Sequence, residues 1–330
     1  MNNLDLLSIG DSSLDAFIFP TESESLCQLN DKECYICFSY GDKIPVKDLE
    51  FSVGGNAANN SVGSSRLGVK SAAVLTLGGD EIGNQIVEAL AKDGVDTTYV
   101  SRQKGKRSNY SLAINYSGER TIFTYKDEID YVLPEKFPST SWIYLTSMGD
   151  NFSDAYVKVA DHIKGKSGVK LAFNPGSRQI RAGYEKMKDI LRISYMVYVN
   201  RKEAEIITNF SDSKDKEKNL LDALIKLGPK VPVITDGVGG SYVFYEGKYY
   251  HSGVLPIDAY ERTGAGDAFG SGCISALIQG KSIEEALLWG TVNSASVIGY
   301  IGAQKGLLKK DEIGTWLERA ESCNVKVEEI

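Results

Sequence analysis

Short apolar runs recur along the chain and alternate with segments that have helical spacing. The first run, LDLLSI at 4–9, is apolar almost throughout, which is typical of a strand buried in a parallel sheet. Helical spacing is found at 153–164 and near 180–191, and residues 71–100 read as a strand, a turn, an amphipathic helix and a strand. This alternation predicts an α/β fold. The other runs that we expect to be strands are 142–147, 169–176, 194–200 and 230–235.

Three segments have short or alternating apolar stretches without a helical period: 13–20, 34–53 and 107–125. In the last of them, NYSLAINY and ERTIFTY are joined at Ser117-Gly118, which predicts a β-hairpin. We expect the three segments to form a small β-sheet beside the main layer. No linker or low-complexity block divides the chain, so we expect residues 1–330 to be one domain that carries these segments as insertions.

Composition and charge narrow the class of protein. Apolar residues make up 42% and charged residues 25% of the 330 positions, which is ordinary for a folded globular chain. The net charge of −7 and the lack of long Lys/Arg clusters argue against nucleic acid or an anionic membrane as a partner. No apolar run reaches about 18 residues, and the N-terminus lacks the basic and apolar regions of a signal peptide. We therefore expect a cytoplasmic protein.

The five cysteines are few and scattered, which fits a reducing compartment. Cys34-x-x-Cys37 has the spacing of a zinc knuckle, and Cys27 is close by. Two interpretations remain open: a three-thiolate metal or redox site, and small packing residues in a β-rich segment.

The chemistry is concentrated in RTGAGDAFGSGCISALIQG, residues 262–280. Gly264, Ala265 and Gly266 lead into Asp267 and then into an apolar helix. The unpaired N–H groups and the dipole of a helix N-terminus favour an anion. A carboxylate at that place can accept the proton of a substrate hydroxyl, so the stretch predicts phosphoryl transfer to an alcohol. The alternative is that Asp267 only caps the helix. The GxGxxG spacing of a dinucleotide fold is missed by one residue, and no Walker-type P-loop is present.

A second glycine-rich helix start, FSVGGNAANNSVGSSRLG, occupies residues 51–68. Its small residues allow another group to approach the backbone closely. TGAGDAF and this earlier stretch resemble the C-terminal and N-terminal signatures of the PfkB/ribokinase family of carbohydrate and nucleoside kinases. The resemblance extends over about residues 4–305 and includes a G-x-D-x-x-G stretch at 78–83. It implies a ribokinase-like three-layer α/β/α fold with a central, mostly parallel sheet and a small β-sheet lid.

The resemblance also implies roles for individual residues. Asp267 would be the base, and the amides of Gly264, Ala265 and Gly266 would form the anion hole. The remaining site residues would be Asp15, Gly55 and Asn59 for the acceptor, Asn200, Thr235, Gly237, Gly240 and Gly302 for the nucleotide, and Glu203 for Mg²⁺ through water. The alternatives are an ordinary Asn cap followed by a first-turn Glu at 200–203, and a plain tight turn at 235–240.

This implies ATP-dependent, Mg²⁺-dependent phosphoryl transfer to a hydroxyl of a small sugar or nucleoside, by a homodimer that pairs through the lid. The alternatives are a phosphosugar kinase, a non-catalytic sugar- or nucleotide-binding protein on the same fold, and a nicotinamide oxidoreductase. Two positions depart from the pattern. Glu261-Arg262 replaces an Asp-Thr pair, which leaves K⁺ activation open and leaves Arg262 either on a phosphate or in solvent. Asn56 stands where ribokinase has Lys, which argues against ribose as the acceptor.

Overall fold

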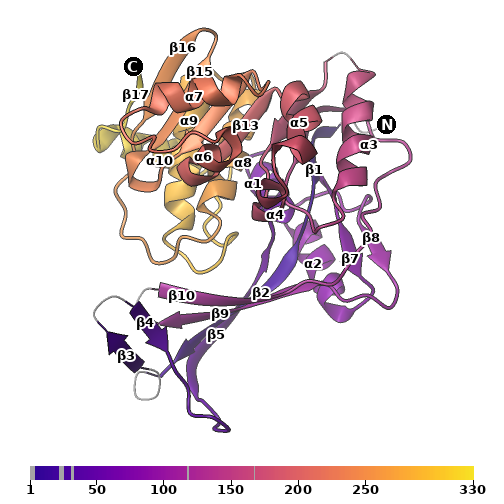
Figure 1. The fold of residues 1–330 in the computed structure, drawn as a ribbon, viewed down its shortest axis with the longest axis vertical. Helices are drawn as coiled ribbons and strands as arrows, with labels where there is room; N and C mark the ends of the chain where they lie inside the picture. The colour runs from indigo at the N-terminus through magenta and orange to yellow at the C-terminus, as the bar shows by residue number, and fades with distance from the viewer. Residues whose placement is uncertain (1–3, 22–25, 31–32, 117–118, 167) are drawn as a thin grey trace.

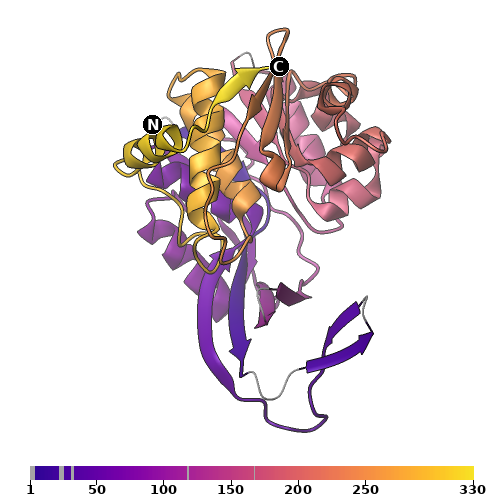
Figure 2. The same ribbon diagram turned by 90° about the vertical axis from the view of Figure 1, so that its left-hand side faces the viewer.

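The computed structural model describes residues 4–21, 26–30, 33–116, 119–166 and 168–330, with the backbone alone at 26–30, 33–35 and 119. A central sheet lies between two helical layers, and a smaller sheet projects from the body as a lid (Figures 1 and 2). Within the described residues, the central sheet has nine strands in the order β17-β16-β15-β14-β13-β12-β11-β1-β6. They are β1 (Leu4–Ile9), β6 (Ser71–Val74), β11 (Thr140–Leu145), β12 (Lys170–Phe173), β13 (Met196–Asn200), β14 (Val231–Thr235), β15 (Ser241–Tyr245), β16 (Lys248–Ser252) and β17 (Val327–Glu329).

In this sheet β6, β1, β11, β12, β13 and β14 pair in parallel, and β15, β16 and β17 extend it by antiparallel pairing. The predicted α/β fold with a mostly parallel sheet is therefore confirmed. The expected strands at 4–9, 142–147, 169–176, 194–200 and 230–235 correspond to β1, β11, β12, β13 and β14.

Helices cover both faces of the sheet, which explains why the strands are apolar throughout. In β11, Ile143 and Leu145 face one layer, and Trp142 and Tyr144 face the other. The first layer consists of α3 (Ser153–Lys164), α4 (Ser177–Ala182), α5 (Tyr184–Ile193), α6 (Arg201–Thr208) and α7 (Glu217–Ile225). The second consists of α8 (Ala265–Ile278), α9 (Ile283–Val297) and α10 (Ile313–Ser322). In Figure 2 these layers lie on opposite sides of the strands.

A third apolar cluster joins the body to the lid. It contains side chains of α1 (Asn56–Arg66), α2 (Glu81–Lys92) and β7 (Thr76–Gly78). β7 pairs in parallel with β8 (Ser101–Gln103), and α2 connects the two strands. The expected βαβ unit therefore exists as a separate small sheet. Asp80 caps α2 by accepting hydrogen bonds from the Gly83 N–H at 3.0 Å and the Ser108 hydroxyl at 2.7 Å. The G-x-D-x-x-G stretch therefore stabilises this connection.

The lid sheet has the order β10-β9-β2-β5. Its strands are β2 (Ser13–Pro20), β5 (Val46–Gly54), β9 (Asn109–Tyr116) and β10 (Glu119–Tyr125). The expectation that 34–53 joins this sheet throughout is wrong, because β4 (Glu33–Ile36) pairs with β3 (Leu26–Asn30) in a separate two-stranded sheet. The predicted turn at Ser117-Gly118 lies outside the described residues. No helix among the described residues is long and apolar enough to cross a membrane.

Glycines in α8 allow close packing beneath the site. A Cβ at Gly270 would collide with the Tyr198 hydroxyl, and Tyr198 is buried and stacked on Tyr144. Asn293 of α9 is also buried, and its side chain donates to the Ala268 carbonyl at 2.7 Å. Asn293 thus joins α9 to α8.

Replacing Gly270 by alanine should lower the free energy of unfolding by about 1–3 kcal/mol, because Tyr198 has no room to move. Urea denaturation measures the change. Gly314 of α10 is the matched control: nothing lies within 4 Å of the Cβ that alanine would add. Gly314→Ala should leave stability unchanged or raise it by up to about 1 kcal/mol. Equal effects of the two substitutions would contradict the packing argument.

Candidate functional site

The predicted residues gather at the carboxyl ends of the parallel strands, beside the N-terminus of α8 and next to the lid. Strand β1 has β6 on one side and β11 on the other, so the chain reverses its direction of winding there. Open α/β sheets bind ligands in the crevice at such a point. Asp11 and Asp15 follow β1, Asn200 ends β13, and Thr235 ends β14.

The N-terminus of α8 has the geometry of an anion site. Gly264 is the N-cap with φ 79°, and a Cβ there would collide with Ala303. Gly266 is exposed, and Ala265 is partly buried. The first N–H groups of a helix have no acceptor inside the helix, and the helix dipole favours negative charge beside them. A phosphoryl oxygen would find unpaired donors at this point.

Asp267 lies in the first turn of α8 and is held by α1. The Asn59 amide nitrogen donates to its carboxylate at 2.8 Å, and Gln304 donates to the Asn59 oxygen at 3.0 Å. Burial raises the pKa of Asp267 to about 6; the Asn59 hydrogen bond opposes this rise, and the negative charge of Glu203 adds to it. The carboxylate is therefore ionised at neutral pH and yet basic enough to accept a proton.

The three residues predicted to bind the acceptor, Asp15, Gly55 and Asn59, differ in their contacts. Asp15 is partly buried on lid strand β2 and accepts from the Ser13 hydroxyl at 2.9 Å. Burial raises the pKa of Asp15. Gly55 is the N-cap of α1 with φ 90°, and a Cβ there would collide with the backbone of Ser12. Asn59 differs from the other two, because its side-chain nitrogen and oxygen both form hydrogen bonds with other side chains of the protein.

Two ion pairs join the lid to the body, and the sequence analysis did not identify their cations. Lys126, which follows β10, lies 3.1 Å from the Asp11 carboxylate, and the Tyr131 hydroxyl donates to the same carboxylate at 2.6 Å. Arg120 of β10 contacts Glu261. No motif marks Arg120 or Lys126, because lid strands have no regular pattern of functional residues.

Glu261 is buried just before the anion site. The Thr263 N–H donates to its Oε1 at 2.9 Å, and the Thr263 hydroxyl donates to the same oxygen. Its other oxygen, Oε2, is buried without a hydrogen-bond partner among the residues that the structure describes. The departure Glu261-Arg262 in the sequence was the one signal that pointed to this position.

A cavity of about 450 Å³ adjoins the anion site and is lined by none of the predicted acceptor residues. Thr235, Gly237 and Gly240 line it together with Ala265 and Gly266, so the T-x-G turn and the start of α8 share one space. Most of its surface is apolar, and the apolar side chains come from residues that the sequence analysis missed. Examples are Val254, Leu255, Ile257, Phe269, Ala295 and Ile298. The exposed Arg262 also lines the cavity.

Gly302 lies apart from this cavity. A Cβ on Gly302 would come within 2.9 Å of Ser52 on β5, and its φ is 80°. Gly302 therefore packs against the lid and does not line this cavity, and its contact with the nucleotide stays a prediction.

Asn200 and Glu203 form a capping box at the start of α6. The Asn200 oxygen accepts from the Glu203 N–H at 3.0 Å, and the Glu203 carboxylate accepts from the Asn200 N–H at 2.9 Å. The alternative of an ordinary cap is thus correct for their hydrogen bonds. Burial raises the pKa of Glu203, and its charge affects Asp267, so it also lies near the site.

No group of three or more His, Cys, Asp or Glu side chains that could hold a metal ion occurs within the described residues. A single carboxylate such as Glu203 fits a Mg²⁺ ion that is held mainly by phosphate and water. The side chains of Cys27 and Cys34 lie outside what the structure describes, so the three-cysteine alternative stays a prediction.

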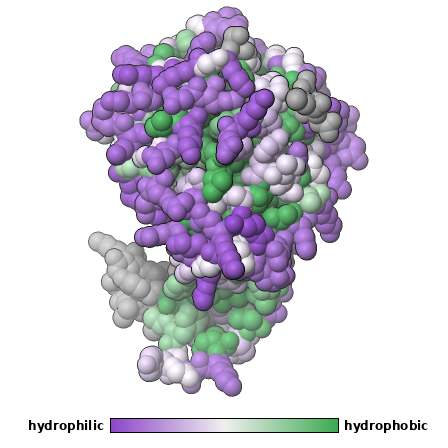
Figure 3. Space-filling model, turned by 90° about the vertical axis from the view of Figure 1, so that its right-hand side faces the viewer, coloured by the Kyte–Doolittle hydropathy of each residue, from purple (hydrophilic) through white to green (hydrophobic). Residues whose placement is uncertain are grey.

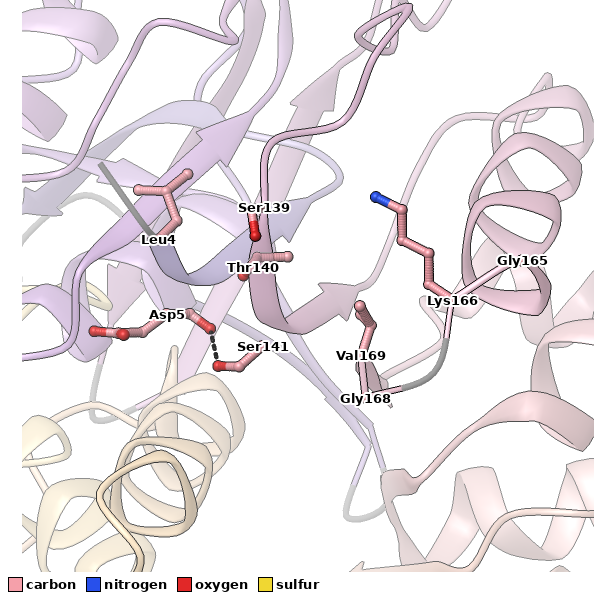
Figure 4. A pocket seen from close by; sticks show the side chains of 9 residues that line it. All are labelled: Leu4, Asp5, Ser139, Thr140, Ser141, Gly165, Lys166, Gly168 and Val169. Carbon is pink, nitrogen blue, oxygen red and sulfur yellow. Dashed lines mark hydrogen bonds between the residues drawn. The ribbon is translucent and has the colours of Figure 1, made fainter. Parts of the chain in front are cut away.

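A second hollow of about 620 Å³ lies at the opposite ends of the strands, where β1 and β11 begin (Figure 4). Lys166 and Asp5 are its charged residues. In Figure 4 the Ser141 hydroxyl bonds the Asp5 backbone oxygen, at 2.9 Å. None of the predicted site residues lines this hollow.

The sequence matches the pfkB family carbohydrate kinase over residues 26–310. The chain belongs to the pfkB family. It is 27% identical to a ribokinase of Haemophilus influenzae over 85% of this chain and 92% of that protein. It is 26% identical to a 5-dehydro-2-deoxygluconokinase of Halalkalibacterium halodurans, over 83% of this chain and 87% of the relative.

The fold agrees with a solved structure of ribokinase from Arabidopsis thaliana in complex with ribose and ATP. The TM-score is 0.79 at 20% identity, over 96% of this chain and 99% of the other. The resemblance to the PfkB/ribokinase family and the ribokinase-like fold are thereby confirmed, and this pfkB protein is a carbohydrate kinase. Its relatives are named for different sugars, so family membership leaves the acceptor open.

Replacing Asp267 by asparagine should stabilise the protein at neutral and alkaline pH. Because the folded pKa of Asp267 is raised to about 6 from an ordinary 3.8, its contribution to stability is fully present below pH 3.8 and is lost as the pH rises through 6. The variant avoids this loss. Its advantage should reach on the order of 1–2 kcal/mol above pH 7 and vanish near pH 4.

Urea denaturation across this pH range measures the difference. Asp161 of α3, whose side chain is 69% exposed, is the control, and Asp161→Asn should change stability little because its carboxylate is largely in solvent. An Asp267→Asn advantage that stays constant from pH 4 to pH 8 would contradict the proposed cause.

Proposed function

We propose that this pfkB protein transfers the γ-phosphoryl group of ATP to a hydroxyl of a small, uncharged sugar or nucleoside, with Asp267 as the base. The observation that carries the proposal is the position of Asp267. Its carboxylate lies at the N-terminus of α8, between an apolar cavity beside the T-x-G turn and the polar side chains beneath the lid. The raised pKa of about 6 suits a base that works near neutral pH.

The cavity supports nucleotide binding. Its volume of about 450 Å³ and its apolar surface suit a flat aromatic base, and its lining includes the start of α8. ATP bound in this way would extend its phosphates along Gly237 and Gly240 toward the amides of Gly264, Ala265 and Gly266. Those amides would stabilise the charge that develops on the transferred group. Arg262 lines the same cavity, so its predicted contact with a phosphate is favoured over solvent.

The acceptor would lie between Asp15, Gly55 and Asp267. Asp267 would accept the proton of the hydroxyl as its oxygen attacks, and Asp15 would hold another hydroxyl. Asn59 would act through Asp267, because its amide is already committed to that carboxylate. Mg²⁺ would supply charge neutralisation on the phosphates, with Glu203 holding one of its waters. Arg120 contacts Oε1 of Glu261, whereas Oε2 is buried without a partner among the described residues, so the contacts of Glu261 leave K⁺ binding open.

Charge favours an uncharged acceptor over a phosphosugar. In the proposed arrangement the acceptor lies near four carboxylates, those of Asp11, Asp15, Glu261 and Asp267, and the charge of Glu261 already acts on Asp15. Two of these are already paired with the cations of the lid, since Lys126 binds Asp11 and Arg120 binds Glu261. A phosphate on the acceptor would be repelled by the carboxylates of Asp15 and Asp267, and Arg120 and Lys126 are already paired with other carboxylates.

The decisive experiment measures acceptor-dependent ADP release with matched pairs of acceptors, each as the free sugar and as its phosphate, and with nucleosides. We expect turnover with a neutral acceptor and a kcat/KM about 100-fold lower for its phosphorylated partner. Asp267→Asn should lower kcat by about 10²- to 10⁴-fold. Nucleotide binding without turnover, equal in both proteins, would instead support a sugar- or nucleotide-binding protein.

The dependence of kcat/KM on pH tests the base directly. Activity should fall as the pH drops through about 6, the pKa of Asp267. Asn59→Ala removes the hydrogen bond that lowers this pKa, so the acid limb should move to higher pH. Asn56→Ala is the matched control on α1, because Asn56 bonds Asn174 and not Asp267. An acid limb that is identical in all three proteins would rule out Asp267 as the titrating base.

We also propose a homodimer that forms through the lid. Both edge strands of the lid sheet, β5 and β10, carry exposed apolar side chains, and unpaired strand edges favour association. These side chains are Val46, Leu49, Phe51, Ile122, Phe123 and Tyr125. In Figure 3 apolar surface is prominent at the lower end of the molecule, whereas the body above is mostly polar.

Native mass spectrometry should show a dimer, and Phe51→Lys should convert it to a monomer because the lysine would be buried at the interface. Phe51 is 59% exposed in the isolated chain. Val157 of α3 is 57% exposed and lies far from the lid in sequence, so Val157→Lys is the matched control and should leave the dimer intact. A single peak at the monomer mass for the unaltered protein would count against this assembly.

A further inference from the structure

Arg201 makes contacts that neither the motifs nor the proposed chemistry explain. It follows Asn200 and opens α6, and only 15% of its side chain is exposed. One guanidinium nitrogen lies 2.8 Å from the Glu217 carboxylate and 2.8 Å from the Asp236 carboxylate. The other terminal nitrogen donates to the Ser213 carbonyl at 2.8 Å. Arg201 thus connects α6, the start of α7 and the turn that follows β14.

Asp236 is the centre of that turn. Its backbone N–H donates to the Gly240 carbonyl at 2.8 Å, and its carbonyl accepts from the Gly239 N–H at 2.8 Å. A Cβ on Gly239 would come within 2.5 Å of the Asp236 carboxylate, so the turn folds closely around this side chain. The Asp236 carboxylate is therefore packed against a tight turn that its own backbone groups help to close.

The same turn supplies one wall of the cavity. Thr235, Gly237 and Gly240 line it, but Asp236 does not, because its side chain is directed to Arg201. The His251 ring, which does not line the cavity either, bonds the Gly239 oxygen through a nitrogen at 2.9 Å. Arg201 and His251 thus hold the turn from outside the cavity.

We propose that Arg201 is a positioning residue for the nucleotide, which acts through Asp236 to hold the 235–240 turn in its binding conformation. The inference rests on the proposed function, because it takes the cavity as the nucleotide site. Arg201 also adjoins Asn200, so its pairing with Asp236 joins the N-x-x-E helix to the T-x-G turn. Without this ion pair the turn would have to be ordered by the nucleotide itself, which weakens binding.

The two carboxylates that pair with Arg201 provide an internal comparison. Glu217 and Asp236 lie at the same distance from the same nitrogen, and their side chains are 18% and 30% exposed. Glu217 belongs to α7, which contributes no residue to the cavity lining. Loss of the Glu217 pair therefore removes a similar interaction from Arg201 without releasing the turn.

The test measures ATP and ADP binding by isothermal titration calorimetry for the unaltered protein and for Asp236→Asn, Glu217→Gln and Arg201→Met. Asp236→Asn and Arg201→Met should raise the Kd of both nucleotides about tenfold, the scale of one charge-assisted hydrogen bond. Glu217→Gln should change it less than about twofold. The double variant Arg201→Met/Asp236→Asn should bind no more weakly than either single variant.

Steady-state kinetics separates positioning from general damage. KM for ATP should rise in Asp236→Asn, whereas KM for the acceptor and kcat at saturating ATP should stay unchanged. An equal loss of nucleotide affinity in Glu217→Gln, or an equal rise in both KM values, would overturn the inference. If Arg201→Met does not fold, the comparison of Asp236→Asn with Glu217→Gln still decides.

The same titration distinguishes this inference from the proposed function. If the unaltered protein binds neither ATP nor ADP, the nucleotide site is wrong and both proposals fall. If it binds them and Asp236→Asn binds them equally well, only the role of Arg201 is disproved.

Discussion

The hydrogen bond between Asn59 and Asp267 is the contact on which the site depends. It joins the starts of two helices that are 208 residues apart in the chain. These helices approach closely because their facing positions are small: a Cβ on Gly63 of α1 would collide with Ser271 of α8. A larger residue there would separate the helices and leave the Asp267 carboxylate without its donor. The contact also limits how far burial raises the pKa of that carboxylate, so geometry and protonation have one origin.

The body and the lid contribute opposite charges to the site around Asp267. The body supplies most of the carboxylates at the acceptor position, and the lid supplies Arg120 and Lys126, which pair with two of them. The space on the other side of α8 is lined mainly by apolar side chains. A partly buried carboxylate that is ionised above pH 6 weakens the fold, so Asp267 lowers stability at neutral pH, and its proposed role as the base would account for that cost.

The hydrophobic pattern was sufficient for the body and insufficient for the lid. Apolar runs such as 4–9 and 194–200 can only be buried between two helical layers, so their spacing specified the strands and the α/β class. The lid strands have one exposed face and weak alternation, which is why 34–53 was assigned to the sheet although its first part pairs with β3 instead. Gly302 shows the same limit for single residues, since its motif does not indicate that it packs against Ser52 of the lid.

The sequence by itself determined the fold class, the family and the two glycine-rich helix starts, because these depend on residues that are neighbours in the chain. The tertiary structure alone decided which distant groups meet. It directed the Asn59 amide to Asp267, paired Arg120 with Glu261, and held the 235–240 turn by Arg201 through Asp236. The physical reason is that hydrogen bonds and ion pairs act over a few ångströms in space, whereas the sequence records only order along the chain.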